Sequence, residues 1–170
     1  MKKLLLHACC APCSTSVLER LMPIYDVTVF FYNPGIEPAE EYYRRLSELM
    51  RLLSVLDVPL IEGAYEPQLY ADAVKGLESQ PEGAARCAVC FEQRIEAACA
   101  VQGFDFVTTT LTVSPHKNAR LINDIGIAVC GDRWVESDFK KQNGFLRSID
   151  LSREYGFYRQ NYCGCRFSEH

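Results

Sequence analysis

The chain has 170 residues, of which 48% are hydrophobic and 24% charged, with a formal net charge of −4. These values fit one soluble domain with a core of its own and exclude a generally basic nucleic-acid binder. No run of about twenty apolar residues is present, and the apolar run Leu4–Leu6 is too short for a signal peptide, so we expect a cytoplasmic protein without a membrane span.

Cysteine is the informative residue type, with nine copies in the chain. An odd number without a secretion signal argues against a disulfide framework. Clustered cysteines in a reducing compartment indicate metal binding or redox chemistry instead.

Strands and helices alternate along most of the chain. The first part predicts a strand at Lys2–Ala8, a helix capped by Ser14 or Thr15, a strand at Asp26–Tyr32 and a helix from Pro38 to about Leu56. The middle predicts a strand at Val58–Ile61, helices at Ala71–Leu77 and Cys87–Val101, and a strand at Phe104–Leu111. A helix at Lys117–Ile125 and a further strand at Gly126–Cys130 follow.

This alternation predicts an α/β fold with a doubly wound, mostly parallel sheet, formed by one domain over residues 1–170. Residues 131–170 lack a regular pattern, and we expect them to be an irregular segment packed on the same domain. Three unusual loops, HACCAPC, NPGIEP and SPHK, each follow a predicted strand. Ligands of such sheets bind beyond the carboxyl ends of the strands, so these loops predict one shared site.

Four cysteines form the best candidate for a metal site. Cys87 and Cys90 make a CxxC motif near a helix start, where both thiols share a helix face and thiolates are favoured. The adjacent pair Cys9 and Cys10 would complete a set of four thiolates. Four thiolates suit either a four-iron cluster or a tetrahedral zinc ion. Adjacent cysteines are an awkward zinc knuckle, which favours the cluster.

The other cysteines divide into three kinds. Cys13 is either a fifth ligand or a half-buried helix-start residue. Cys99 and Cys130 lie in no motif and are expected in the core as free thiols. The pair Cys163 and Cys165, separated by one glycine, can close a small strained disulfide, and we interpret it as redox-active, with metal ligation as the alternative.

Basic and aromatic side chains alternate near the C-terminus. Such a pattern suits phosphate contacts and base stacking, although by itself it is better explained by a solvated surface over core aromatics. His116 is a candidate phosphate contact or proton donor, whereas His7 inside the first strand is expected to be a core residue. The candidate substrate-binding residues are Lys117, Lys140, Lys141, Tyr158 and Arg159.

Five motifs, in order, resemble the cobalamin-independent epoxyqueuosine reductases of the QueH family: HACCAPC, FYNPGIEPAEEY, RCAVCFEQR, TTLTVSPHK and YRQNYCGC. The resemblance runs from Leu6 to about Phe167. It implies reduction of the epoxide of epoxyqueuosine at the wobble position of tRNA, the last step of queuosine biosynthesis. It also implies a fold like that of the adenine-nucleotide α-hydrolases, without use of ATP or cobalamin.

The same resemblance implies roles for individual cysteines. Cys9, Cys10, Cys87 and Cys90 would hold a [4Fe-4S] cluster, and Cys163 with Cys165 would form the redox-active disulfide. Cys13 stands where some family members have an aspartate beside an additional mononuclear iron, so it would ligate that iron or act in catalysis. The expected partners are the tRNA anticodon arm and an electron donor of unknown identity, with the protein acting as a monomer.

Two other functions fit the cysteines less well. An ATP-independent tRNA sulfur transferase would place a persulfide on Cys163 or Cys165. A zinc-bound RNA-binding module would be non-catalytic.

Overall fold

A four-stranded parallel sheet forms the centre of the computed structural model, which describes residues 1–168. Its strands are β1 (Lys3–His7), β2 (Asp26–Phe31), β3 (Leu60–Glu62) and β4 (Phe106–Thr109), in the spatial order β3-β2-β1-β4. All three neighbouring pairs are parallel. The central strand β1 is apolar throughout its middle and has no exposed residue there, because helices cover both of its faces.

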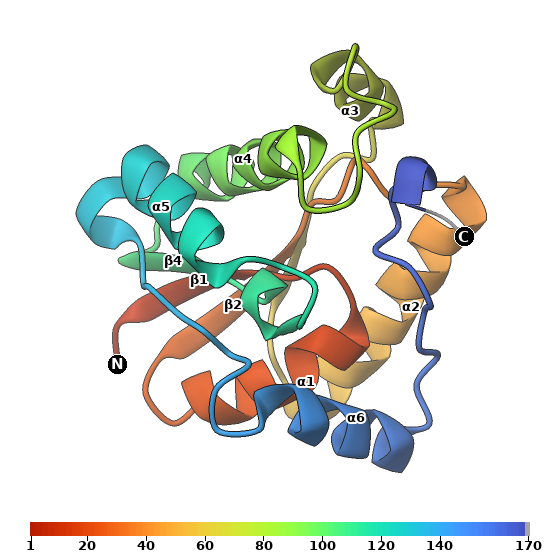
Figure 1. The fold of residues 1–170 in the computed structure, drawn as a ribbon. Helices are drawn as coiled ribbons and strands as arrows, with labels where there is room; N and C mark the ends of the chain where they lie inside the picture. Colours follow the sequence, from red (N-terminus) through yellow and green to blue (C-terminus); the bar gives the residue numbers. More distant parts are fainter. Residues whose placement is uncertain (169–170) are drawn as a thin grey trace.

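Helices lie on both faces of the sheet, which confirms the doubly wound prediction (Figure 1). One face is covered by α1 (Ala11–Leu21), α2 (Ala39–Leu56) and α6 (Gly144–Tyr155). The other face is covered by α4 (Ala85–Ala100) and α5 (Ala119–Cys130). The short helix α3 (Pro67–Ala73) contacts α4, and 3₁₀ turns lie at Leu111–Val113, Gly131–Arg133 and Arg166–Ser168.

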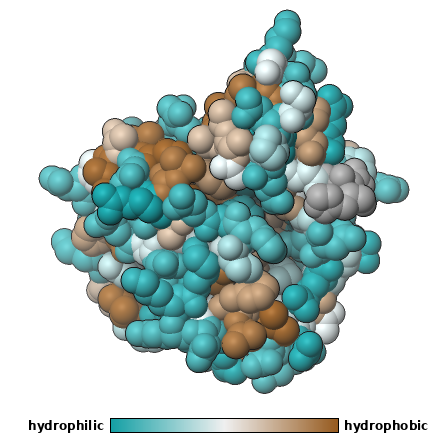
Figure 2. Space-filling model, viewed as in Figure 1, coloured by the Kyte–Doolittle hydropathy of each residue, from teal (hydrophilic) through white to brown (hydrophobic). Residues whose placement is uncertain are grey.

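The molecular surface facing the viewer in Figure 2 is mainly hydrophilic, with hydrophobic residues gathered over α5 and over α6. Within residues 1–168, no helix is both long and apolar enough to cross a membrane.

The predicted strand at Gly126–Cys130 is wrong, because these residues are the last part of α5. Ile127 and Val129 favour strands by propensity, but tertiary packing decides otherwise. Gly126 lies directly against the indole ring of Trp134, and a side chain at position 126 would overlap that ring. Because position 126 has no side chain, α5 can continue through it and pack closely on Trp134.

The prediction of an irregular segment over residues 131–170 is wrong for its central part. Helix α6 occupies twelve residues of it and packs against α1. Beyond α6, the chain runs back along α2, as Figure 1 shows in dark blue. The segment therefore returns to the carboxyl edge of the sheet.

Helix α1 begins earlier than predicted. Its N-cap is Cys10, whose thiol sulfur accepts a hydrogen bond from the backbone N–H of Cys13 at 3.5 Å. Ser14 and Thr15, the predicted caps, lie inside the helix and donate their hydroxyls to the carbonyls of Cys10 and Pro12. A thiol thus replaces the usual hydroxyl or carboxylate cap.

The prediction that Cys99 and Cys130 are free thiols in the core is also wrong. They are half-buried at the C-terminal ends of α4 and α5 and form a disulfide. The two residues are 31 positions apart, and only the side-by-side packing of α4 and α5 brings their C-terminal ends together.

Candidate functional site

The loop after β1 brings three thiols together. Cys9 and Cys10 follow the strand directly, and Cys13 lies in the first turn of α1. The sulfur atoms of the three residues all lie within 4.8 Å of one another, close enough to hold one metal ion. Cys9 and Cys10 are buried, with their sulfurs 3.8 Å apart.

The Cys9 thiol is the most easily ionised of this group. Hydrogen bonds from the Cys10 and Cys13 thiols lower the pKa of Cys9 well below its usual value, although burial acts in the opposite direction. The positive charge of Lys117 and a hydrogen bond from Thr110 act in the same direction as the thiols. A thiolate is the form that binds a metal, so this loop is suited to metal ligation.

A second group of cysteines lies where α4 begins. Cys87 and Cys90 are on the first two turns of α4, and the backbone N–H of Gly83 donates to the Cys87 sulfur at 3.2 Å. Burial raises the pKa of the Cys90 thiol to about 11. A small cavity of about 70 Å³ is lined by these two cysteines together with Cys163 and Cys165 of the C-terminal segment.

Hydrogen bonds from α2 and the β2–α2 loop position the Cys163–Cys165 turn. The Arg45 guanidinium donates to the carbonyls of Tyr162 and Cys163, each at 2.9 Å. The backbone N–H of Glu37 donates to the Gly164 carbonyl at 2.9 Å. The turn is therefore held from two sides and not left as a flexible chain end.

Tyr70 of α3 makes the closest polar contact with this turn. Its hydroxyl oxygen lies 2.8 Å from the sulfur of Cys165, and both side chains are buried. Burial raises the pKa of the Tyr70 hydroxyl, so it stays protonated and can donate to the sulfur. No motif in the sequence marks Tyr70, because its partner is 95 residues away.

A larger cavity of about 400 Å³ lies beside the smaller one. Its walls include Cys9 and Cys13 from the first group and Cys163 from the C-terminal turn. The two cavities are adjacent, because they share five wall residues: Glu82, Arg94, His116, Lys117 and Cys163. Thiols from three distant parts of the chain therefore line two adjacent cavities.

The loops that follow β1, β2 and β4 in the chain meet near these cavities, as expected for the carboxyl edge of a parallel sheet. The loop after β4 contributes His116 and Lys117 to the cavity walls. The loop after β2 contributes Asn33, whose amide donates to the Ala8 carbonyl at 3.0 Å. His7 is a core residue, as predicted, with its ring bonded to Thr109, Asn33 and the Tyr32 carbonyl.

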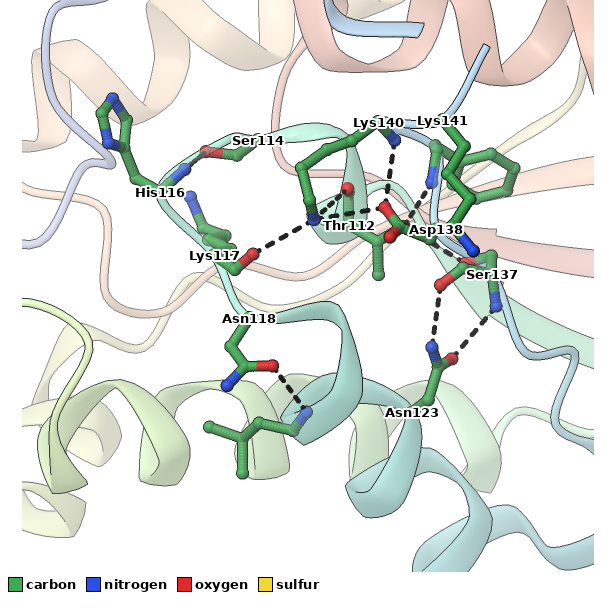
Figure 3. Close-up of polar contacts among 12 residues, drawn as sticks. Thr112, Ser114, His116, Lys117, Asn118, Asn123, Ser137, Asp138, Lys140 and Lys141 are labelled. Atoms are coloured by element: carbon green, nitrogen blue, oxygen red, sulfur yellow. Dashed lines mark hydrogen bonds and ion pairs between the residues drawn. The ribbon is translucent and has the colours of Figure 1, made fainter.

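Two of the predicted substrate-binding residues, Lys117 and Arg159, line the larger cavity. Figure 3 shows that Lys140 instead supports the loop after β4: its ammonium donates to the carbonyls of Thr112 and Lys117 and lies 3.3 Å from Asp138. Lys141 is exposed.

Tyr158 packs against α2 and is not among the residues that line the cavities. Its hydroxyl donates to the Glu41 carboxylate at 3.0 Å, and the Arg44 guanidinium stacks 3.6 Å from its ring centre.

Sequence comparison identifies close relatives. The family described as epoxyqueuosine reductase QueH matches residues 4–170. Proteins named epoxyqueuosine reductase QueH include one from Streptococcus pyogenes, 45% identical over 97% of this chain and 69% of its own length. Another, from Staphylococcus epidermidis, is 41% identical over 98% of this chain and 76% of its own length. One from Thermotoga maritima is 33% identical over 99% and 91%.

Proposed function

The chain belongs to the epoxyqueuosine reductase QueH family and is an oxidoreductase of queuosine biosynthesis, and we propose that the cysteine-lined cavity is where it reduces the epoxide. The observation that carries this proposal is the convergence of thiols from the β1–α1 loop, the start of α4 and the C-terminal turn on one region. The site of a two-electron reduction needs several redox-competent groups close together, and these three segments provide them.

We assign a [4Fe-4S] cluster to Cys9, Cys10, Cys87 and Cys90, with Cys13 available for an additional iron beside it. The donor set supports this assignment, because all five cysteines are free thiols. Cys9, Cys10 and Cys13 lie within 4.8 Å of one another, whereas Cys87 and Cys90 are not part of that close group and line the neighbouring smaller cavity. A bound cluster supplies one-electron reduction, and an open iron position supplies a Lewis acid. This loop has Cys13 where some family members have an aspartate, so an iron bound there would have a soft thiolate ligand and not a hard carboxylate.

The Cys163–Cys165 dithiol matches the electron count of the reaction. Converting an epoxide to an alkene breaks two C–O bonds, takes up two electrons and two protons, and releases water. Oxidation of two thiols to one disulfide yields the same two electrons and two protons. The Gly164 turn keeps the two thiols two residues apart, and the disulfide must then be reduced by an external electron donor.

The cavity also offers polar groups for the departing oxygen. The Lys117 ammonium lines both cavities, close to Cys9 and Cys163. It can donate a hydrogen bond to the epoxide oxygen and stabilise the negative charge that develops there as the C–O bonds break. His116 lies at the same wall and is exposed, so it can exchange protons with solvent.

The tRNA would approach with its anticodon loop, where unpaired bases can be splayed out and inserted into a pocket. Arg159 at the cavity wall and the exposed Lys141 are suited to phosphate contacts. Lys140 keeps the loop after β4 in place, and Tyr158 with Arg44 forms a stacked pair at the surface of α2.

The test is anaerobic incubation of reduced protein with tRNA that contains epoxyqueuosine, followed by nucleoside analysis. We expect queuosine without added ATP or cobalamin. An unchanged epoxide in the presence of an intact cluster would overturn the proposed site. A colourless protein that contains zinc would favour the RNA-binding alternative, and a thiolated nucleoside the sulfur transferase.

Single cysteine variants separate the two proposed roles. Cys87→Ser should lose the brown colour and the bound iron. Cys165→Ser should keep both and lose turnover, and a loss of iron in Cys165→Ser would make that cysteine a ligand. Cys99→Ser combined with Cys130→Ser is the matched control, because this pair lies at the far ends of α4 and α5 and should leave iron content and turnover unchanged.

A further inference from the structure

Three arginines are buried among residues 1–168, and two of them have evident structural roles. Arg45 is paired with Glu41 and holds the carbonyls of the cysteine turn. Arg86 donates to the carbonyls of Glu78 and Gln80 and to the Ser168 hydroxyl at 2.9 Å. Each of these guanidinium groups stabilises a chain segment, so the cost of burying its charge is offset by hydrogen bonds.

Arg94 differs from both. Its side chain is 3% exposed, and among residues 1–168 it has no ion pair with a carboxylate. Its Nε is buried without a hydrogen-bond partner in that part of the chain, as is the Nε of Arg86. The other nitrogens of Arg86 donate three hydrogen bonds, however, whereas none is found there for Arg94. A buried cation without a carboxylate normally destabilises a fold by several kcal/mol. Such a group is retained where something anionic occupies the space beside it.

The place of Arg94 identifies that space. It is four residues after Cys90 on the same face of α4, and it lines both the larger and the smaller cavity. Burial disfavours its charge, yet the neighbouring groups of Cys90, Cys9 and Cys163 raise the pKa of Arg94 above its usual value. These neighbours come from both cysteine groups, which agrees with the position of Arg94 in the walls of both cavities.

We propose that Arg94 is the counter-ion of the metal–thiolate centre, a positioning residue that raises the reduction potential of the bound cluster. This inference rests on the proposed cluster. Four thiolate ligands make a cluster net anionic, and each added electron increases that charge. A fixed positive charge and N–H donors near the sulfurs favour the reduced state, because cluster potentials depend on net charge and on hydrogen bonds to sulfur.

The guanidinium suits this role better than an ammonium would. Arginine stays charged under all ordinary conditions and is more weakly hydrated than lysine, so it is the cation that tolerates a buried position. Its planar group presents several N–H donors at once, which can reach more than one sulfur. We therefore expect Arg94→Lys to preserve part of the effect and Arg94→Gln to remove it.

The experiment is an anaerobic redox titration, followed by optical and electron paramagnetic resonance spectra, of cluster-loaded wild type, Arg94→Gln and Arg94→Lys. The control is Arg120→Gln, which removes the same charge from an exposed side chain on α5. We expect Arg94→Gln to shift the reduction equilibrium at least tenfold toward the oxidised cluster, about 59 mV for one electron. The reduction potential of Arg94→Lys should lie between those of wild type and Arg94→Gln. The potential of Arg120→Gln should equal that of wild type, because solvent screens the charge at position 120.

The possible outcomes separate the two proposals. A wild type without iron–sulfur absorption contradicts the proposed cluster itself. A loaded Arg94→Gln variant with the wild-type potential overturns the counter-ion role and leaves the cluster in place. If Arg94→Gln loses iron while Arg94→Lys retains it, positive charge is required and the inference holds. Loss of iron in both variants, with the fold preserved by circular dichroism, would mean that shape and not charge matters at position 94.

Discussion

At the scale of single residues, Gly164 determines where the two C-terminal thiols point. Its φ angle is +108°, a region that side chains rarely adopt. A Cβ atom there would also lie 2.8 Å from Cγ1 of Ile36 and 2.9 Å from Nη1 of Arg45. The glycine is therefore required twice, by its backbone conformation and by its neighbours.

Gly164→Ala should lower turnover at least tenfold, because the added methyl group would displace the Arg45 guanidinium and break its hydrogen bond to the Cys163 carbonyl. Steady-state assays on the iron-loaded protein measure this effect. Gly103→Ala is the control: Gly103 has a φ of +95° but no atom within 4 Å of its missing Cβ. Both changes should cost roughly 1 kcal/mol of stability from backbone strain. Equal turnover in the two variants would contradict the role of the turn.

His7 shows how burial affects an ionisable group without giving it a catalytic role. Burial, followed by the charge of Arg94, lowers the pKa of His7 to about 4, from an ordinary value of 6.5. The folded state therefore holds a neutral imidazole at pH values where the unfolded chain binds a proton. Stability from this group is complete above pH 6.5 and is lost as the pH falls toward 4.

Comparing wild type with His7→Gln in urea unfolding between pH 7.5 and 5.5 tests this account. Glutamine retains a donor and an acceptor but does not titrate. The wild-type free energy of unfolding should fall relative to the variant, by up to about 1.4 kcal/mol per pH unit below 6.5. Curves that run parallel over the whole range would show that His7 titrates normally.

At the scale of secondary structure elements, α2 holds the C-terminal segment through two arginines of different exposure. Arg45 is almost fully buried and binds two carbonyls of the cysteine turn. Arg51, less than two turns further along, binds the Tyr155 carbonyl at 2.8 Å from an exposed position. Loss of the hydrogen bonds from arginine to backbone carbonyls should therefore affect stability strongly at position 45 and little at position 51.

Arg45→Lys should destabilise the fold by about 2 to 4 kcal/mol, because an ammonium cannot hold two carbonyls and the Glu41 carboxylate in the same geometry. The Cys165 sulfur, now 5% exposed as a residue, should be alkylated faster by iodoacetamide. Mass spectrometry of the modified peptide measures the rate. Arg51→Lys should change neither quantity appreciably. Unchanged alkylation in Arg45→Lys would mean that other contacts hold the turn.

At the scale of the whole molecule, the Cys99–Cys130 disulfide joins two helices that also carry the site. Helix α4 begins with Cys87 and Cys90 and ends at Cys99, and α5 follows the loop of His116 and Lys117 and ends at Cys130. The cross-link thus secures the ends of α4 and α5 that lie farthest from the cavity.

Chain-entropy arguments predict about 3 to 4 kcal/mol of stabilisation for a loop of this length. The wild type should therefore lose stability when a reductant is added, as measured by urea unfolding. The double variant Cys99→Ser with Cys130→Ser should be weaker from the start and insensitive to the reductant. An equal response to reductant in both proteins would place the effect elsewhere, among the site cysteines.

Local pattern was sufficient for much of the fold. The apolar run in β1, the β-branched run in β2 and the helical spacing in α2 each bury their own residues, so their types followed from sequence periodicity. The parallel, doubly wound arrangement followed from their alternation. Helix α6 and the end of α5 did not follow, because packing on α1 and on Trp134 outweighs weak or opposite local preferences.

The sequence by itself determined that this is an oxidoreductase of the QueH family, because motifs are local and their order survives without coordinates. It also marked the three loops that meet at the carboxyl edge of the sheet. Only the tertiary structure decided which groups accompany the thiols: Tyr70 at Cys165, Arg45 at the turn, Arg94 in the walls of both cavities, and Cys99 with Cys130 away from the site. The physical reason is sequence distance, since hydrogen bonds and charges act between atoms that folding brings together, and no spacing along the chain records them.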